Sequence, residues 1–370
     1  MATPAPGPVA VNAAIVSRRP SGLGVVARET ALGLSRLSPR VVLFGGDAAL
    51  FPGARVETLP AWTTAGGGLG LGGLPRFFWT QAALPWRLRR LGAAKLLSPN
   101  HELLLLCPCP QVVVMHDLLP LLYPDEYPRQ RRFYRHILPR ALARAETIIA
   151  VSQNTKNDLV SRYGLDPQRI RVIHSGVDAR FRPGAGAPPA RPYILSVGSR
   201  YPHKNLPRLL EAFASLASRG LPHELVLAGS EEGGRAGELE RRARELGCAE
   251  RVRFAGVVAP EDLPALYARA DLFVLPSLYE GFGLPALEAM ASGCPVAAAR
   301  VASLPEVCGD AAEYFDPADA GALSSCLAGL LGDPARRASL RDAGLARARS
   351  FTWEKTARAY AEVLGLETAA

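Results

Sequence analysis

Apolar residues along this chain gather in short runs, separated by longer stretches with helical periodicity. Short apolar runs bounded by turn residues are typical of strands buried inside a sheet. The predicted strands lie at residues 9–16, 41–44, 111–115, 147–151, 171–173, 193–197, 224–228, 251–254, 272–275 and 295–299. Strands that alternate with helices in this way predict an α/β fold with parallel, doubly wound sheets.

The length and one composition shift predict two domains. The chain has 370 residues, which is more than one ordinary domain holds. A segment rich in proline, glycine and alanine at 183–192 interrupts the pattern, and the alternation of strands and helices restarts directly after it. We therefore expect an N-terminal domain over residues 1–185 and a C-terminal domain over 186–352. A last helix, from about residue 353 to 370, is long enough to cross back to the first domain.

The most informative polar pattern follows the apolar run at 272–275. Gly283 permits a tight turn, and Pro285 suits the first turn of a helix because its missing N–H costs nothing there. Glu280 precedes this turn, and Glu288 lies about one turn into the helix. The N–H groups at a helix N-terminus favour an anion. The pattern therefore predicts a site that holds phosphate and hydroxyl groups together.

Other chemistry-bearing residues also follow predicted strands, where open α/β sheets bind ligands. Arg200 and Lys204 surround a strand-to-helix turn and could hold a diphosphate. Val257 follows the strand at 251–254 and is a candidate rim for a nucleobase. His116 and Asp117 end the strand at 111–115, and we interpret them as site residues although a single histidine is more often structural.

Gly22 and Gly24, with Ala27, match the GxGxxA pattern of dinucleotide-binding folds, and Asp47 could then contact a ribose. The segment before Gly22 is longer than that fingerprint normally allows. We therefore favour a loop whose N–H groups meet a phosphate or an acceptor, and keep a dinucleotide-dependent enzyme as an alternative.

Residues 129–144 contain six arginines and no acidic residue, with apolar side chains between them and Pro139 as a helix kink. Such a segment either binds anionic lipid or forms a solvated helix face. The first alternative would place this segment in peripheral contact with an anionic membrane, and the second would leave it in water.

Composition places few further limits. Hydrophobic residues make up 48% and charged residues 21% of the chain, and the net charge is +9. This excess suits phosphorylated substrates, lipid or nucleic acid, but no nucleic-acid module is recognisable, so we expect no nucleic-acid partner. The six cysteines form no CxxC or zinc-ligand pattern. The start lacks signal-peptide character, and no apolar run approaches about 20 residues. We expect a cytoplasmic protein, with contact at the inner membrane face as the alternative.

Taken together, the motifs resemble those of family 4 glycosyltransferases, over nearly the whole chain. They are Glu280-Gly281-Phe282-Gly283-Leu284-Pro285 with Glu288, Pro202-His203-Lys204-Asn205, His116-Asp117-Leu118, Val151-Ser152 with Thr155-Lys156, and Leu304-Pro305-Glu306-Val307. The resemblance implies a retaining enzyme of GT-B architecture, in which two Rossmann-like domains face a cleft and the second holds a nucleotide sugar.

The resemblance also implies roles for individual residues. Glu288 would bind the ribose hydroxyls, Glu280 the donor sugar and Lys204 the diphosphate. The N–H groups of Phe282, Gly283 and Leu284 would lie near sugar and phosphate, His116 beside the donor sugar, and Gly22 and Gly24 near the phosphates or the acceptor. Many relatives carry arginine where this chain has Ser199, and Arg200 is shifted by one position, so Lys204 is the firmer assignment of the two cations.

The expected reaction moves a hexose, with mannose favoured, from a GDP- or UDP-linked donor to a glycan or lipid-linked acceptor in polysaccharide or glycolipid synthesis. The chain has no Asp-x-Asp motif, so we expect no metal and no cofactor besides the donor. A non-catalytic scaffold subunit of the same fold is the second alternative.

Overall fold

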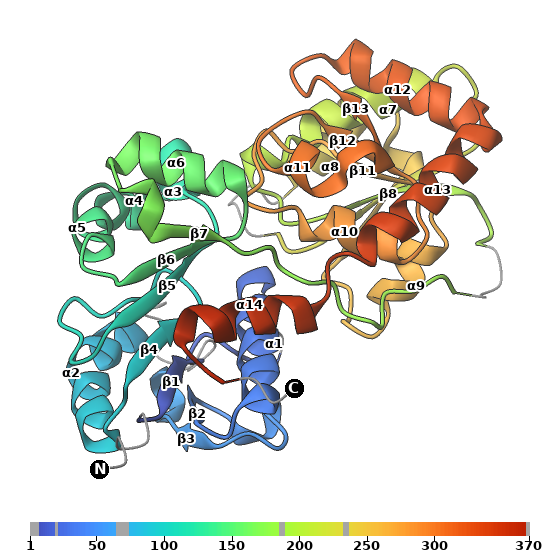
Figure 1. Cartoon of the computed structure of the whole chain (residues 1–370). Coiled ribbons are helices and arrows are strands. Elements are labelled where there is room, and N and C mark those ends of the chain that lie inside the picture. Colours follow the sequence, from blue (N-terminus) through green and yellow to red (C-terminus); the bar gives the residue numbers. More distant parts are fainter. Residues whose placement is uncertain (1–6, 19–20, 64–73, 185–188, 232–236, 368–370) are drawn as a thin grey trace. The chain divides into compact units, whose positions relative to one another are not determined.

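The computed structural model describes residues 7–18, 21–63, 74–184, 189–231 and 237–367. The chain forms two compact units (Figure 1). Met1–Gly176 and Trp353–Ala370 make up the first unit, and Val177–Thr352 makes up the second. The sequence placed the boundary at residues 185 and 186, and residues 185–188 lie outside the described part of the chain.

The first unit is built on a parallel sheet of seven strands in the order β3-β2-β1-β4-β5-β6-β7. The five inner strands have apolar centres and are buried because helices cover both faces, whereas the edge strands β3 and β7 carry Glu57 and Arg171 at their centres. The strands of this sheet are β1 (Val9–Asn12), β2 (Val41–Gly45), β3 (Val56–Thr58), β4 (Lys95–Ser98), β5 (Gln111–Met115), β6 (Thr147–Ala150) and β7 (Ile170–Val172). The strand order reverses between β1 and β4, which are neighbours in the sheet.

The helices of the first unit are mostly short. They are α1 (Gly22–Leu37), α2 (Leu74–Leu91), α3 (Leu119–Leu122), α4 (Pro128–Arg132), α5 (Leu138–Leu142), α6 (Gln153–Tyr163) and α14 (Trp353–Leu364). A π-helical turn over Phe133–Ile137 joins α4 to α5, and Pro139 lies in the first turn of α5, where proline is tolerated. Ser152 caps α6 by accepting from the N–H of Thr155.

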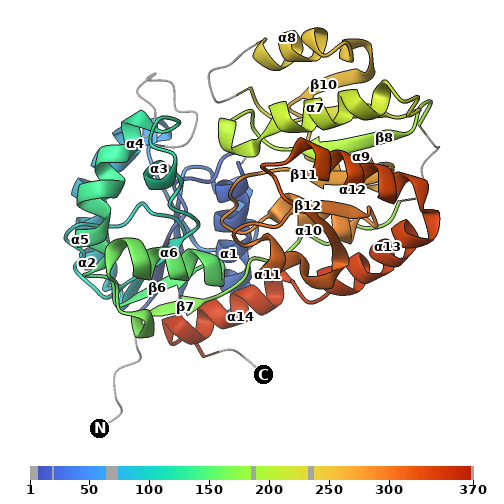
Figure 2. The same cartoon turned by 90° about the horizontal axis from the view of Figure 1, so that it is seen from above.

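The last helix completes the first unit. α14 lies beside α1 (Figures 1 and 2), where Gly33 of α1 faces Ala357 of α14. The Thr356 hydroxyl donates to the carbonyl of His174, and Lys95 Nζ donates to the carbonyl of Val363. The final segment is therefore held by both apolar packing and hydrogen bonds.

The second unit contains a parallel sheet of six strands in the order β10-β9-β8-β11-β12-β13. The strands are β8 (Tyr193–Val197), β9 (Glu224–Ala228), β10 (Val252–Gly256), β11 (Leu272–Leu275), β12 (Val296–Ala299) and β13 (Ala312–Phe315). The helices are α7 (Leu206–Ala217), α8 (Glu238–Glu245), α9 (Leu263–Ala268), α10 (Leu284–Ala291), α11 (Leu304–Cys308), α12 (Ala320–Gly332) and α13 (Pro334–Ala348). The strand order reverses between β8 and β11.

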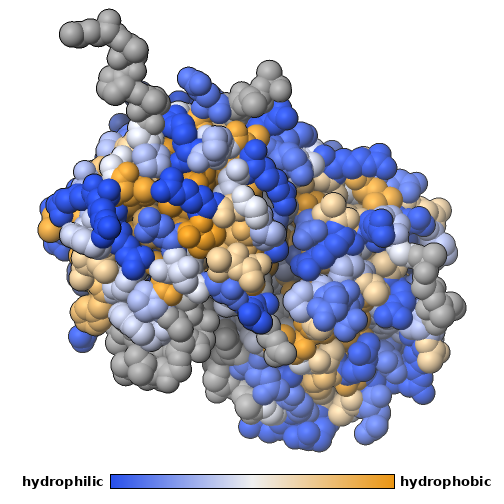
Figure 3. Space-filling model, turned by 90° about the horizontal axis from the view of Figure 1, so that it is seen from below, coloured by the Kyte–Doolittle hydropathy of each residue, from blue (hydrophilic) through white to orange (hydrophobic). Residues whose placement is uncertain are grey.

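These two sheets confirm the expected fold class of two Rossmann-like, doubly wound domains. Large apolar residues outside the cores include Phe78 and Trp86 of α2, which are 65% and 59% exposed. On the face shown in Figure 3, hydrophobic residues are interspersed with hydrophilic ones. Within the described residues, no helix combines the length and apolar character needed to cross a bilayer.

The packing of α1 on α14 yields a stability prediction. A Cβ atom added at Gly33 would lie 2.6 Å from Ala357 Cβ, whereas a Cβ at Gly329 of α12 would meet no atom within 4 Å. We expect Gly33→Ala to lower the free energy of unfolding by about 1–3 kcal/mol through overpacking. Gly329→Ala should raise it by up to about 1 kcal/mol through helix propensity. Urea unfolding of the full chain checks both variants, and a Gly33→Ala variant as stable as Gly329→Ala would contradict the packing.

Candidate functional site

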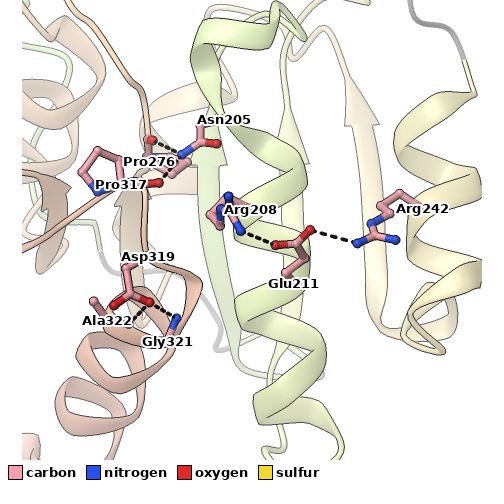
Figure 4. A network of polar contacts seen from close by, with 9 residues as sticks. All are labelled: Asn205, Arg208, Glu211, Arg242, Pro276, Pro317, Asp319, Gly321 and Ala322. Atoms are coloured by element: carbon pink, nitrogen blue, oxygen red, sulfur yellow. Dashed lines mark hydrogen bonds and ion pairs between the residues drawn. The ribbon is translucent and has the colours of Figure 1, made fainter.

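The reversal of strand order in the second unit brings two connections together. Ligands of open α/β sheets bind at the carboxyl ends of the strands where the order reverses, here β8 and β11. The backbone N–H of Leu278, after β11, donates to the carbonyl of His203, after β8, over 2.7 Å. Asn205 Nδ2 donates to the carbonyls of Pro276 and Pro317 over 3.1 and 2.9 Å (Figure 4). Asn205 adopts φ 57°, a left-handed conformation that asparagine tolerates better than most residues.

The helices around this point are held by ion pairs and a cap (Figure 4). Glu211 of α7 accepts from Arg208 and from Arg242 of α8, each over 2.9 Å. Asp319 caps α12 by accepting from the N–H groups of Gly321 and Ala322. The helices next to these connections, α7, α8 and α12, are therefore held in place by polar contacts.

Lys204 and Glu280 form an ion pair at this reversal. Lys204 Nζ lies 2.7 Å from Glu280 Oε1, and the two side chains are only 18% and 10% exposed. The Ser277 hydroxyl, itself buried, donates to the same carboxylate oxygen over 2.6 Å. A pair shielded from water in this way keeps most of its attraction. The ammonium and the carboxylate are thus held in place beside the start of α10.

Ser303 shapes the turn that leads from Glu280 into α10. Its buried hydroxyl lies 2.8 Å from the carbonyl oxygen of Glu280 and 2.9 Å from that of Phe282. Gly283 has φ 101°, and a Cβ atom there would lie 2.7 Å from Leu304 Cδ2. The turn therefore requires glycine at position 283 for two reasons. The carbonyls of Glu280 and Phe282 are held by Ser303 directly before α10 begins. The N–H groups of the first helical turn have no partner within the helix and favour an anion.

Glu288 is one turn into α10 and is half-buried. Burial raises the pKa of its carboxyl to about 7, which outweighs the lowering effects of the Tyr267 hydrogen bond and of Arg180. The Tyr267 hydroxyl donates to Glu288 Oε2 over 3.0 Å. Tyr267 is held in turn by edge contacts with the rings of Phe181 and Phe273. Glu288 is therefore an oriented hydrogen-bond acceptor with a pKa near neutrality.

Arg200 has different partners from Lys204. Its guanidinium lies 2.7 Å from Glu240 and 3.3 Å from Glu231, and over the ring of Phe254, with a side chain only 6% exposed. Ser199, beside it, is half-buried, and Val257 after β10 is 72% exposed. A direct contact of Arg200 with a diphosphate stays a prediction, and it would compete with these two carboxylates.

The remaining sequence candidates belong to the first unit. His116 Nε2 lies 2.9 Å from the carbonyl oxygen of Pro99 and must donate, because a carbonyl only accepts; burial lowers the pKa of this imidazole. Asp117 Oδ1 accepts from the N–H of Leu119. Gly22 and Gly24 open α1, with Gly22 exposed and Gly24 buried.

Asp47 is already engaged in this structure, since it accepts from the N–H of Ala49 and pairs with Arg18 over 3.0 Å. These contacts count against the ribose role that the dinucleotide alternative gives it.

Four residues that support the site were given no role from the sequence, namely Ser277, Ser303, Tyr267 and Asn205, although Asn205 belongs to the Pro202-His203-Lys204-Asn205 motif. Ser303 directly precedes the Leu304–Val307 motif, and Ser277 directly follows the run at 272–275, so their positions offered a signal. The contacts of Ser303, Tyr267 and Asn205 join residues at least 21 positions apart and could not be read from spacing, whereas Ser277 contacts Glu280 three residues further on. Among the described residues, no group of three or more His, Cys, Asp or Glu side chains is arranged to hold a metal ion.

Comparisons with known proteins agree on one family. The family model described as "Glycosyl transferases group 1" matches residues 178–347, and the model "Glycosyltransferase Family 4" matches residues 20–181. The O-antigen chain mannosyltransferase B of Escherichia coli is 34% identical over 256 residues, covering 66% of this chain and 67% of that protein. A D-inositol 3-phosphate glycosyltransferase of Corynebacterium glutamicum is 31% identical over 299 residues, covering 76% and 68%.

Other curated relatives are matched over a smaller share of their length. The MMP alpha-(1->4)-mannosyltransferase of Mycolicibacterium hassiacum is 35% identical, and the match covers 62% of this chain and 57% of that protein. The chain thus spans from about a third to about two thirds of the length of the curated relatives it matches.

Two solved structures illustrate the similarity in fold. The sucrose-phosphate synthase of Thermosynechococcus elongatus matches with a TM-score of 0.78 at 23% identity, covering 97% of this chain and 98% of that one. The Anabaena protein HepE in complex with UDP-glucose matches with a TM-score of 0.76 at 19% identity, covering 97% and 99%. At these identities the likeness supports the fold alone.

The raised pKa of Glu288 yields a prediction for stability against pH. Its native pKa of about 7 exceeds the ordinary value of 4.5, so the ionised carboxylate destabilises the folded state, and this cost develops as pH rises from about 4.5 to 7. Glu288→Gln removes the charge and can still accept from Tyr267. We expect it to raise the free energy of unfolding of the second unit by about 1–3 kcal/mol near pH 8.5 and by little near pH 5.

Urea unfolding at both pH values checks this expectation, with the exposed Glu250→Gln as the matched control. An equal effect of Glu288→Gln at both pH values would mean that the carboxyl titrates as it does in water.

Proposed function

The chain belongs to the group 1 glycosyltransferases and is an enzyme that transfers glycosyl groups, and from this premise we propose that it moves a hexose from a nucleoside-diphosphate sugar to a glycan or lipid-linked acceptor. One observation carries the proposal. At one reversal of strand order, a helix N-terminus, the Lys204–Glu280 pair and the oriented Glu288 offer groups for an anion and for hydroxyls together.

The proposed donor contacts follow from these groups. Lys204 and the first N–H groups of α10 bind the diphosphate, since both stabilise negative charge. Glu288 accepts hydrogen bonds from the ribose hydroxyls, and Glu280 accepts from hydroxyls of the sugar. Val257, exposed at the end of β10, borders the nucleobase.

The reaction we propose breaks the bond between the anomeric carbon and the β-phosphate oxygen. The oxygen of an acceptor hydroxyl forms the new bond to the anomeric carbon on the same face, and the hydroxyl proton leaves with the departing nucleoside diphosphate. The transition state is oxocarbenium-like and places growing negative charge on the β-phosphate, which Lys204 stabilises electrostatically. Because the cation and the helix N-terminus supply this stabilisation, we propose that the transfer needs no metal. Because the new bond forms on the same face, the transfer we propose retains the anomeric configuration.

We favour mannose as the transferred sugar. Two of the relatives named above are called mannosyltransferases, which supports a GDP-linked mannose donor. The structural neighbour HepE was solved with UDP-glucose, so a UDP-hexose is the competing donor. Polysaccharide or glycolipid synthesis is the process that the O-antigen relative suggests.

The donor proposal is tested with purified full-length variants. We expect GDP-mannose or UDP-glucose to raise the melting temperature of the wild-type protein. Lys204→Ala and Glu288→Ala should each weaken donor binding by about tenfold or more, since each loses a charge-assisted hydrogen bond. The exposed Lys355→Ala and Glu354→Ala serve as matched controls. Transfer activity at the wild-type level in both site variants would refute the assignment.

We also propose that the segment α4–α5 contacts an anionic membrane surface. Arg129, Arg131, Arg132, Arg135 and Arg140 are exposed there, and Ile137 is 41% exposed among them. Arginines beside an exposed apolar residue suit an interface of phosphates and acyl chains. The enzyme would then lie at the membrane that contains a lipid-linked acceptor.

Vesicle sedimentation tests this contact. Replacing Arg131, Arg132 and Arg135 together by glutamine should lower binding to vesicles that contain phosphatidylglycerol by more than about tenfold, since each cation contributes about 1 kcal/mol at such a surface. The same three changes should have no effect with neutral phosphatidylcholine vesicles. Equal sedimentation of wild type and variant with the anionic vesicles would rule out the proposed contact.

A further inference from the structure

Two cysteines with one residue between them lie in the connection from β4 to β5. Cys107 and Cys109 are both half-buried and reduced. Their Sγ atoms are 3.9 Å apart, close enough for one thiol to donate a hydrogen bond to the other sulfur. The proposed donor site uses neither residue, so this pair of thiols has no role in the reaction described above.

The segment that carries the pair is closed at both ends. Gln111 of β5 accepts from the N–H of Leu104 over 2.7 Å and donates to the carbonyl of Leu104 over 3.1 Å. Gln81 of α2 accepts from the N–H of Leu105 over 2.9 Å. After the pair, the carbonyl of Pro110 accepts from a backbone N–H of β4 over 2.9 Å. The two cysteines therefore lie in a short loop with fixed ends.

The backbone of this loop suits a bond between the two sulfurs. Pro108 separates the cysteines, and the chain bends at residues 108 and 109. Two Cα atoms that are two residues apart lie at most about 7 Å from each other, and a bend shortens this distance toward the range of about 4.4–6.8 Å that is usual for disulfides. Joining the sulfurs therefore requires mainly rotation of the side chains.

A disulfide at this place would contribute little to the stability of the fold. The stabilisation by a crosslink grows with the number of residues in the loop that it closes, and this loop runs only from Cys107 to Cys109. The reduced side chains already pack against an apolar cluster that includes Trp79, Leu84 and Leu88. A bond that the fold does not need, in an accessible loop, is of the labile kind that other thiols reduce.

The two thiols differ in reactivity. The hydrogen bond from Cys109 lowers the pKa of Cys107 and outweighs the raising effect of burial. The same hydrogen bond, together with burial, raises the pKa of Cys109. Since the thiolate is the nucleophilic form of cysteine, Cys107 is the first of the two to react. Leu106, beside it, is 79% exposed and Pro108 is exposed, so small reagents reach the loop.

We propose that Cys107 and Cys109 form a reversible redox dithiol, which a small disulfide such as glutathione disulfide converts to an intramolecular disulfide. In the first step the Cys107 thiolate attacks one sulfur of glutathione disulfide, whose S–S bond breaks, and one glutathione thiolate leaves. In the second step Cys109 gives its proton to water and its sulfur attacks the Cys107 sulfur. The bond between Cys107 and glutathione breaks, and the second glutathione thiolate leaves.

The electrons balance over these two steps. The two cysteines lose two electrons and two protons, and glutathione disulfide takes up both to become two molecules of glutathione. An excess of reduced glutathione or dithiothreitol reverses the exchange. A second cysteine this close also protects Cys107, because a sulfenic acid formed there by peroxide condenses with Cys109 before it is oxidised further.

The pair lies away from the edge of the sheet at which ligands bind. Cys109 is two residues before Gln111, where β5 begins, whereas open α/β sheets bind ligands at the carboxyl ends of their strands. The proposed donor site belongs to the second unit. The redox inference is therefore independent of the proposed function, and oxidation of the pair should leave donor binding unchanged.

The first test uses the wild-type, full-length protein. It is incubated with excess glutathione disulfide, alkylated with N-ethylmaleimide and digested with trypsin, and the peptide 96–129, which contains this pair and no other cysteine, is weighed. We expect the peptide to carry neither label nor glutathione and to be about 2 Da lighter than its reduced form, the mass of the two hydrogens lost. Dithiothreitol should restore two sites for alkylation. A peptide alkylated at both cysteines, or one that keeps glutathione, would overturn the inference.

The second test compares thiols and variants. Cys326 of α12 is half-buried as well, and burial raises its pKa to about 12, so we expect the pair to react with glutathione disulfide at least about tenfold faster than Cys326. Cys109→Ser should stop after the first step and keep one glutathione on Cys107, whereas Cys326→Ser is the matched control and should form the disulfide as the wild type does. Equal rates for the pair and for Cys326 would contradict the proposal.

One further measurement separates this inference from the proposed function. The rise in melting temperature caused by the donor should be the same for the reduced and the oxidised protein. A protein that forms the disulfide but shows neither this rise nor transfer would refute the proposed function and support the redox dithiol. A protein that binds the donor but does not form the disulfide would refute the redox dithiol alone.

Discussion

The candidate site of this protein depends on one constraint of parallel sheets. Connections between parallel strands cross over with the same hand, so a sheet that grows in both directions from its first strand must reverse its order once. At that point the two flanking connections leave toward opposite faces, and the strand ends between them stay uncovered. The described part of the chain contains this reversal twice, at β1/β4 and at β8/β11. Polar residues end β1 and β4, and polar residues lie in the connections that follow β8 and β11.

The two reversals differ in their electrostatics, and this difference separates their chemistry. The one in the second unit combines a lysine with the N-terminus of α10, so it suits a ligand that carries phosphate. The one in the first unit has the Arg76–Glu102 ion pair, a contact between the rings of His101 and Tyr134, and burial that lowers the pKa of His101. The same backbone geometry therefore carries different side-chain chemistry in the two units.

Much of this arrangement could be predicted from sequence because it is local. The apolar runs at 111–115, 193–197, 224–228 and 272–275 are strands with those bounds in the structure, since buried parallel strands need little besides apolar residues. β4 was missed because Lys95 and Ser98 leave only two apolar residues between them, and with it the residues that follow β4 were missed as well. Ser303 and Tyr267 were missed because their partners, Glu280 and Glu288, are 23 and 21 residues away along the chain.

Asn205 has a mechanical consequence for the second unit. Its single amide nitrogen bridges the connection after β11 and the one before α12, while its own backbone belongs to the connection after β8. Glycine would accept the backbone angle but could not bridge, and aspartate would present oxygens to two carbonyls that also only accept. Three loops that are far apart in sequence are thereby tied into one body. A change in the length of one of these loops would therefore displace the other two.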